Sequence, residues 1–351
     1  MAGKLLSWFR DRINWAAAEG DWPDIVFSTR VRFARNVHGF PFPGRSSRQS
    51  QAELRRRALD AVKSSRLFPR SREAALETLS PLEKRFLVER RHISHNLAAA
   101  AGAQSVVIAS DETLSAMINE EDHLRLQAIL PGFSVEKCLE LASAAESGLG
   151  ELLPYAYGSE FGFLTACPTN TGTGMRVSCM VHLPALGRAG RLGPALESLS
   201  HLGVTARGMY GEGTYVLGDL YQISNSVCLG RSEEEFAESV RRVIRNLINF
   251  EIKAREDLLR PALRLKTEDA VHRARAVLSG ARLLSYEEFM QNASLARMGL
   301  AMGLRLDLDM DTLNQMTIQA QPAHLSARAG KDLPPGRRDE ARAEFVRSRL
   351  G

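Results

Sequence analysis

The chain has 351 residues, of which 44% are hydrophobic and 25% charged, with a formal net charge of +5 and a pI near 9.2. This composition is typical of a globular protein with one large domain or two unequal ones. It contains no apolar run of about 18 residues that could span a bilayer, and no interleaving of basic and aromatic residues typical of single-stranded nucleic-acid binders. We therefore expect no membrane partner and no direct nucleic-acid partner.

Residues 1–23 are expected to precede the first domain. Apolar residues such as Leu5, Trp8 and Trp15 alternate with charged ones over residues 1–19, which predicts a short amphipathic helix packed on the domain or on a second subunit. The segment lacks the apolar core of a signal peptide. The cysteines, at 138, 167, 179 and 228, have no Cys-x-x-Cys spacing, so neither a zinc site nor a disulfide framework is indicated and a cytoplasmic location is expected.

Residues 24–36 are rich in β-branched side chains and predict a strand. Arg30 and Arg32 are two residues apart and therefore lie on one face of that strand. Two neighbouring guanidinium groups suit an anion such as phosphate. A solvated strand face is the alternative for this pair taken alone.

A run of acids follows further along the chain. Helices are predicted over residues 49–66 and, after a capping box of Ser80 and Glu83, over 81–91, and strands over 105–110 and from Leu114. Residues 119–125 read Asn-Glu-Glu-Asp-His-Leu-Arg and lie between apolar stretches. Charge runs usually form solvated loops, but the apolar flanks indicate that part of this run is held near the core. An amphipathic helix is predicted over 134–149.

The segment at 161–182 is the most distinctive part of the sequence. A predicted strand leads into Cys167, a Pro/Thr/Asn/Gly loop follows, and a second strand is predicted over 176–186. Gly172 and Gly174 allow backbone amides to approach a ligand closely. Thiols become reactive beside cationic groups, but free cysteine is also among the most buried residue types, so Cys167 taken alone is either a core residue or a functional one.

The last part of the chain changes in character. A helix is predicted over 192–202, a glycine-rich turn over 207–213, and a second capping box, Ser232 with Glu235, opens a helix to about Arg255. From residue 257 onward the patterns are helical, with breaks near Gly280, at 303–311 and at 330–336. We therefore predict a domain over 24–256 and a helical C-terminal domain over 257–351.

Four motifs together resemble the catalytic domain of the phosphagen (guanidino) kinases. They are Ser-Thr-Arg-Val-Arg at 28–32, the acidic run at 119–125, Cys-Pro-Thr-Asn-x-Gly-Thr at 167–173 with Arg176, and Arg-Gly-x-x-Gly-Glu at 207–212. Kinases of this family that act on free guanidino compounds carry a helical domain before the catalytic one. Here a helical region follows it and contains Arg-Asp-Glu-Ala-Arg-Ala at 338–343, an arrangement that resembles the bacterial protein arginine kinases.

The resemblance implies an α+β fold, with a mainly antiparallel sheet flanked by helices and followed by a smaller all-α domain. It implies transfer of the ATP γ-phosphoryl group to arginine side chains of proteins, with Mg²⁺ bound through the nucleotide phosphates and no metal ligand supplied by the protein. Glu121 is expected to be the general base, Glu212 to orient the guanidinium, and Cys167 to polarise it. The expected nucleotide-binding residues are Ser28, Thr29, Arg30, Val31, Arg32, His92, Arg125, Arg176, Val177, Ser178, Cys179, Met180, Arg207, Gly208, Met209, Tyr210 and Gly211.

The C-terminal motif is expected to bind phosphoarginine and to regulate the enzyme. Arg338 and Arg342 are four residues apart on a predicted helix, so both would face one phosphoryl group, with Asp339 near the guanidinium part. A self-satisfied charged helix is the alternative.

Three hypotheses of function follow from these motifs. The first is a protein arginine kinase that marks proteins for quality control under stress, with an activator protein, a Clp-type protease and a transcriptional repressor as partners by family resemblance, and at least a homodimer. The second is a small-molecule guanidino kinase, and the third is a non-catalytic adaptor that reads phosphoarginine.

Overall fold

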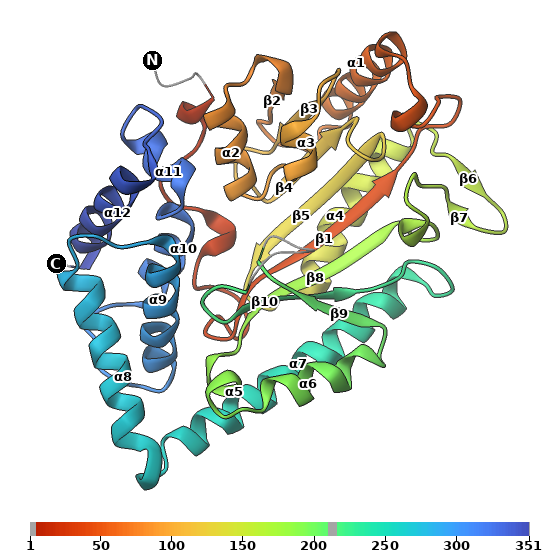
Figure 1. The fold of residues 1–351 in the computed structure, drawn as a ribbon. Coiled ribbons are helices and arrows are strands. Elements are labelled where there is room, and N and C mark those ends of the chain that lie inside the picture. Colours follow the sequence, from red (N-terminus) through yellow and green to blue (C-terminus); the bar gives the residue numbers. More distant parts are fainter. Residues whose placement is uncertain (1–4, 210–215, 351) are drawn as a thin grey trace.

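An eight-stranded sheet organises the protein, in the order β2-β3-β4-β5-β1-β8-β10-β9, with each of its strand pairs antiparallel (Figure 1). The computed structural model describes residues 5–209 and 216–350. The strands of the sheet are β1 (Val26–Arg35), β2 (Arg72–Ala75), β3 (Ser105–Ile108), β4 (Leu114–Ile118), β5 (Leu124–Pro131), β8 (Met175–His182), β9 (Val204–Arg207) and β10 (Leu220–Asn225). A separate hairpin pairs β6 (Tyr157–Gly158) with β7 (Gly162–Phe163).

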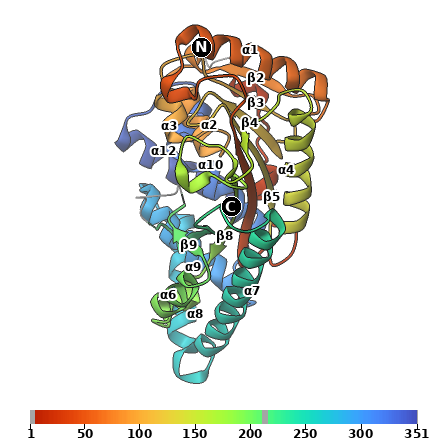
Figure 2. The same cartoon turned by 90° about the vertical axis from the view of Figure 1, so that its right-hand side faces the viewer.

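Strand β1 lies inside the sheet, between β5 and β8, and its side chains alternate between the two faces of the sheet. Val31 and Phe33 are fully buried, whereas Arg30 and Arg32 alternate with them on the other face. The face of Val31 is covered by α4 (Val135–Gly150) and α7 (Glu233–Leu258), as Figure 2 shows. The opposite face is left to the arginines and forms the floor of the pocket described below.

Two helices of the sheet region begin where local signals predict, and one short helix replaces the end of a predicted strand. Ser80 and Glu83 form a reciprocal capping box that opens α2 (Pro81–Glu89), and Ser232 and Glu235 do the same for α7. Pro184 begins a short helix and so ends β8 earlier than predicted. The other elements are α1 (Arg48–Ser65), α3 (His95–Ala99), α5 (Pro184–Arg188) and α6 (Leu192–Ser200), with the short 3-10 helices η3 (Pro43–Arg45), η4 (Leu76–Thr78) and η5 (Pro168–Asn170).

The C-terminal region consists of helices, and it contains no strand within residues 257–350. Its elements are α8 (Pro261–Gly280), α9 (Tyr286–Ala301), α10 (Met310–Gln319), α11 (Pro322–Arg328) and α12 (Pro335–Leu350), so each predicted break marks a junction between helices to within two residues, whereas the junction between α10 and α11 was not predicted. Residues such as Phe289 and Met316 belong to the same buried cluster as Phe27 of β1. The helices therefore pack directly on the sheet region.

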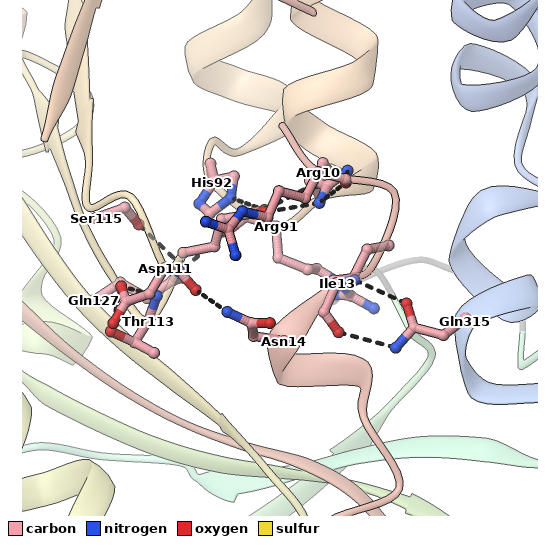
Figure 3. Close-up of polar contacts among 12 residues, drawn as sticks. Arg10, Ile13, Asn14, Arg91, His92, Asp111, Thr113, Ser115, Gln127 and Gln315 are labelled. Atoms are coloured by element: carbon pink, nitrogen blue, oxygen red, sulfur yellow. Dashed lines mark hydrogen bonds and ion pairs between the residues drawn. The ribbon is translucent and has the colours of Figure 1, made fainter. Parts of the chain in front are cut away.

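The N-terminal segment differs from the predicted amphipathic helix. Within residues 5–23 it forms only two 3-10 turns, η1 (Leu6–Trp8) and η2 (Asn14–Ala16). The backbone of Ile13 exchanges hydrogen bonds of 2.8 and 3.0 Å with the Gln315 side chain, and Asn14 donates to Asp111 O at 2.9 Å (Figure 3). Tertiary hydrogen bonds thus replace the helical ones, and the segment links α10 to the β3–β4 loop.

Candidate active site

A pocket of about 540 Å³ lies on the open face of the sheet. Register places Arg32 beside Arg176 and Arg30 beside Ser178, because antiparallel partners share a face. The pocket is lined by six guanidinium-bearing residues, Arg30, Arg32, Arg91, Arg125, Arg176 and Arg207, together with Glu121, Cys167, Gln127, Gln222 and other residues. The sheet therefore gathers five arginines predicted from separate motifs, and adds Arg91.

The electrostatics of this cage favour an anion. Burial, followed by the charges of Arg32 and Arg91, lowers the pKa of Arg30 well below its usual value, and burial with the charge of Arg125 lowers the pKa of Arg32 to about 9. Because guanidinium groups stay protonated in proteins, the cage carries the cost of burying these charges and, in addition, their mutual repulsion. A polyanion bound among these side chains would relieve it.

The acidic run separates into distinct roles. Asn119 has a left-handed backbone, φ 58°, that turns the chain after β4. Glu120 pairs with Arg125 and accepts from Ser94, whereas Glu121, also paired with Arg125 at 2.9 Å, lines the pocket with its side chain 44% exposed. Glu121 is thus the carboxylate of the run that remains open to a ligand.

The next two residues of the run fix it to the segment that follows β1. Asp122 is fully buried, and its Oδ1 accepts from the Ala166 amide and from Asn36 Nδ2, both at 2.7 Å. His123 accepts from the Val37 amide through Nδ1 at 3.0 Å. Asp122 therefore connects the loop of Glu121 to the segment just before Cys167. The apolar flanks of the run indicate that part of it lies near the core, but no local pattern marks Asp122 or Asn36.

The Cys167 loop is shaped by short polar contacts. The side chain of Thr165 donates to Cys167 O at 2.7 Å, and Cys167 Sγ lies 3.0 Å from Thr169 Oγ1. Gly172 has φ 115°, and a Cβ there would lie 2.1 Å from Cys228 O. The strand predicted before Cys167 is confined to Gly162–Phe163 of the β6–β7 hairpin, because the chain then turns to follow these contacts. Cys167 is partly exposed and faces the pocket, so it is not a core cysteine.

Several predicted nucleotide-binding residues point away from the pocket. Thr29 bonds Gly132 O at 2.8 Å and lies 3.6 Å from Cys179 on the helix-covered face, where Val31 and Val177 are also buried. Their neighbours Ser28, Ser178 and Met180 border a small hollow beside Arg30. The alternation of strand side chains divides these consecutive residues between two faces.

The glycine-rich turn is described only in part. Gly208 and Met209 are buried and follow Arg207 at the end of β9. Tyr210, Gly211 and Glu212 lie outside the described residues.

His92 is placed differently from its expected nucleotide contact. The ring is fully buried, its Nε2 lies 2.9 Å from Glu112 Oε2, and it stacks on Phe9. It does not line the pocket, whereas its neighbours Arg91 and Ile93 do. The turn after α2 therefore directs Arg91, and not His92, into the pocket.

The C-terminal motif is also arranged differently from the expectation of one accessible face. Arg342 is 2% exposed, and its guanidinium donates to Ala320 O at 2.8 Å, to Leu284 O at 2.7 Å and to Asp339 at 2.7 Å. Arg338 donates to Leu333 O at 2.5 Å. In this conformation Arg342 holds α12 against its neighbours.

The described residues carry two further findings. No group of three or more His, Cys, Asp and Glu side chains within residues 5–209 and 216–350 could hold a metal ion. No helix in the same ranges is long and apolar enough to cross a membrane.

The chain matches two family models and is similar to several known proteins. Residues 54–254, which include every strand of the sheet except β1, match the ATP:guanido phosphotransferase C-terminal catalytic domain, so the chain contains the catalytic domain of a guanidino phosphotransferase. Residues 264–351 match the protein-arginine kinase McsB C-terminal domain. The chain is 44% identical over 340 residues to the protein-arginine kinase of Moorella thermoacetica, covering 96% of this chain and 97% of that protein. It is 42% identical over 329 residues to that of Caldanaerobacter subterraneus subsp. tengcongensis, covering 93% and 97%. The chain belongs to the protein-arginine kinase family.

Solved structures agree with this fold. A lombricine kinase superposes with a TM-score of 0.59 at 25% identity, over 65% of this chain and 66% of that chain. The duplicated taurocyamine kinase from Schistosoma mansoni, solved with transition-state analogue components, gives a TM-score of 0.61 at 24% identity, over 74% of this chain and 36% of that chain. The predicted α+β fold with a helical C-terminal region is confirmed.

Proposed function

We propose that this protein transfers the γ-phosphoryl group of ATP to the guanidinium group of arginine side chains in proteins. Glu121 and Cys167 line the same pocket as the arginine cage, and this arrangement is the main support for the proposal. A cage of guanidinium groups suits the triphosphate, and an open carboxylate beside a thiol suits a cationic acceptor. One pocket therefore offers cations for the triphosphate and a carboxylate for the guanidinium of the acceptor.

The acceptor sets the chemical problem. A guanidinium has a pKa above 12 and no free lone pair, so the site has to hold the cation and also remove a proton as the nitrogen attacks phosphorus and the bond to the β-phosphate oxygen breaks, releasing ADP. We propose that Glu121 accepts this proton, because its carboxylate is the exposed one of the acidic run. Cys167 would stabilise the guanidinium through its sulfur without forming a covalent bond. Glu212 remains the proposed second carboxylate on the basis of sequence.

The nucleotide would be held by Arg30, Arg32, Arg125, Arg176 and Arg207. Phosphoryl transfer passes through a loose transition state, so these residues act by aligning the γ-phosphate with the acceptor and by balancing its charge. We propose that Mg²⁺ accompanies the nucleotide phosphates, where it would neutralise part of their charge.

The cellular setting proposed for this activity follows from the family resemblance. We propose a cytoplasmic enzyme, at least a dimer, that marks proteins for a Clp-type protease in stress-related quality control. An activator protein and a transcriptional repressor are its other proposed partners. A phosphoarginine-reading role for Arg338, Asp339 and Arg342 would require Arg342 to exchange its carbonyl partners for phosphoryl oxygens.

The test is incubation with Mg·ATP and either free arginine or an unstructured arginine-containing protein, analysed by mass spectrometry at a pH that preserves the P–N bond. Phosphoarginine formed on protein, and lost in both Cys167→Ala and Glu121→Gln, is the expected result. Asp60→Asn, which changes an exposed carboxylate of α1, is the control and should retain activity. Transfer to free arginine alone would indicate a small-molecule guanidino kinase, and binding of phosphoarginine without transfer would indicate an adaptor.

A further inference from the structure

Arg91 occupies a backbone conformation that arginine does not favour. It follows the last residue of α2 and its cap, and it has φ 67°, in the left-handed region. The His92 amide donates to Leu87 O and the Arg91 amide to Val88 O, both at 3.0 Å. This is the Schellman pattern, in which the residue at the position of Arg91 is usually glycine because other side chains are strained there.

The residues on either side of Arg91 hold it in this conformation. Glu112 accepts from Arg90 at 2.6 and 2.8 Å and contacts His92 at 2.9 Å. The backbone oxygen of Arg91 accepts from Gln127 at 2.8 Å, in the turn that Figure 3 shows below the end of α2. With both neighbours tied to one buried carboxylate, the side chain of Arg91 extends from this turn into the pocket of the arginine cage.

The guanidinium of Arg91 adds to a repulsive cluster. Its charge helps to lower the pKa of both Arg30 and Arg32. It also borders the small hollow beside Arg30 and donates to the backbone oxygen of Met209. The strained backbone and the charge repulsion both make arginine at this position unfavourable for the stability of the fold. A functional role for Arg91 is therefore indicated.

We propose that Arg91 is a nucleotide-binding residue whose guanidinium contacts the phosphate groups of ATP, with Glu112 and the flanking Arg90 and His92 positioning it. This inference rests on the proposed function, because it takes ATP as the ligand of the cage. The bond to Met209 O orients the guanidinium before the nucleotide arrives, so less side-chain freedom is lost on binding. Arg91 would thus contribute the sixth cation of the cage.

The experiment measures ATP binding directly by calorimetry, without an acceptor, in the full-length protein. In Arg91→Met the dissociation constant should rise about ten- to a hundredfold, as expected for loss of a charge-assisted hydrogen bond, and Arg91→Lys should recover part of the affinity. Arg91→Gly relieves the strained backbone, so it should unfold at a higher urea concentration than Arg91→Met and still bind ATP weakly. A purely structural role would instead change stability and leave binding unaltered.

Arg66 provides the matched control. It also has a left-handed backbone, φ 56°, at the end of helix α1, but it is exposed and does not line the pocket. Arg66→Met and Arg66→Gly should bind ATP like the wild type. Unchanged ATP affinity in folded Arg91→Met, alongside weakened binding in Arg30→Met, would overturn the inference. Failure of the wild-type protein to bind ATP would overturn the proposed function as well. Unchanged binding in Arg91→Met alone would overturn only the role of Arg91.

Discussion

Replacing Asp122 by asparagine should uncouple the two loops that carry Glu121 and Cys167. The carboxylate accepts from Ala166 N and Asn36 Nδ2 at 2.7 Å, and its other oxygen is buried without a partner among the described residues. Asparagine has the same shape, but its oxygen accepts these bonds without a charge and its amide nitrogen would be buried. Hydrogen bonds to a charged group contribute about 1.5–3 kcal/mol each and neutral ones about half as much. We expect a loss of about 1–3 kcal/mol in the free energy of unfolding.

The activity of the folded variant should fall further than this loss of stability explains. Misplacement of a reacting group by about 1 Å can cost about a hundredfold in rate, so we expect kcat per folded molecule to fall about tenfold or more, with KM for ATP little changed because the arginine cage is intact. The assay is phosphoarginine formation at saturating ATP, corrected for the folded fraction measured by urea denaturation.

Glu251 offers a matched control for this substitution. It is a fully buried carboxylate that accepts from the amides of Ala185 and Leu186 at 3.1 and 3.0 Å, and it does not line the pocket. Glu251→Gln should lower stability and leave kcat per folded molecule unchanged. Equal kcat in folded Asp122→Asn and the wild type, or an equal loss of kcat in both variants, would show that Asp122 does not couple the loops of Glu121 and Cys167.

Three further predictions concern other parts of the molecule. Burial alone would raise the pKa of Glu112, but hydrogen bonding and charge from His92 and Arg90 outweigh it and lower the pKa to about 2. Since the folded pKa is depressed, this stabilisation is present above about pH 4 and is lost as the pH falls towards 2; Glu112→Gln should flatten the pH dependence of urea unfolding in that range. Gly172→Ala should disrupt the Cys167 loop and abolish transfer, because its Cβ would lie 2.1 Å from a backbone oxygen, whereas Gly190→Ala, with φ 67° and open space, should cost only about 1–2 kcal/mol and keep its activity. Arg342→Ala should lower the free energy of unfolding by about 2–4 kcal/mol through its lost carbonyl bonds, and the exposed Arg337→Ala by less than about 0.5 kcal/mol; equal unfolding midpoints for the two would contradict the structural role of Arg342.

Features that depend only on neighbouring residues could be predicted from the amino-acid sequence. The two capping boxes begin α2 and α7 as predicted, and the breaks in the C-terminal region lie between its helices. The two-residue spacing of Arg30 and Arg32 places both on the pocket face, because side chains alternate along a strand. These signals act within one turn of helix or a few residues of strand, so they can be read without a fold.

Which side chains of a motif reach the pocket depends on contacts between distant parts of the chain. Arg91 reaches it and His92 does not, because Glu112, some twenty residues away in sequence, holds the neighbours of Arg91. Buried Arg342 donates to the carbonyl groups of Ala320, just after α10, and of Leu284, in the loop before α9. The backbone of the N-terminal segment bonds to Gln315 and does not form the predicted helix. In each case the deciding partner is distant in the chain, so no local pattern of residues records it.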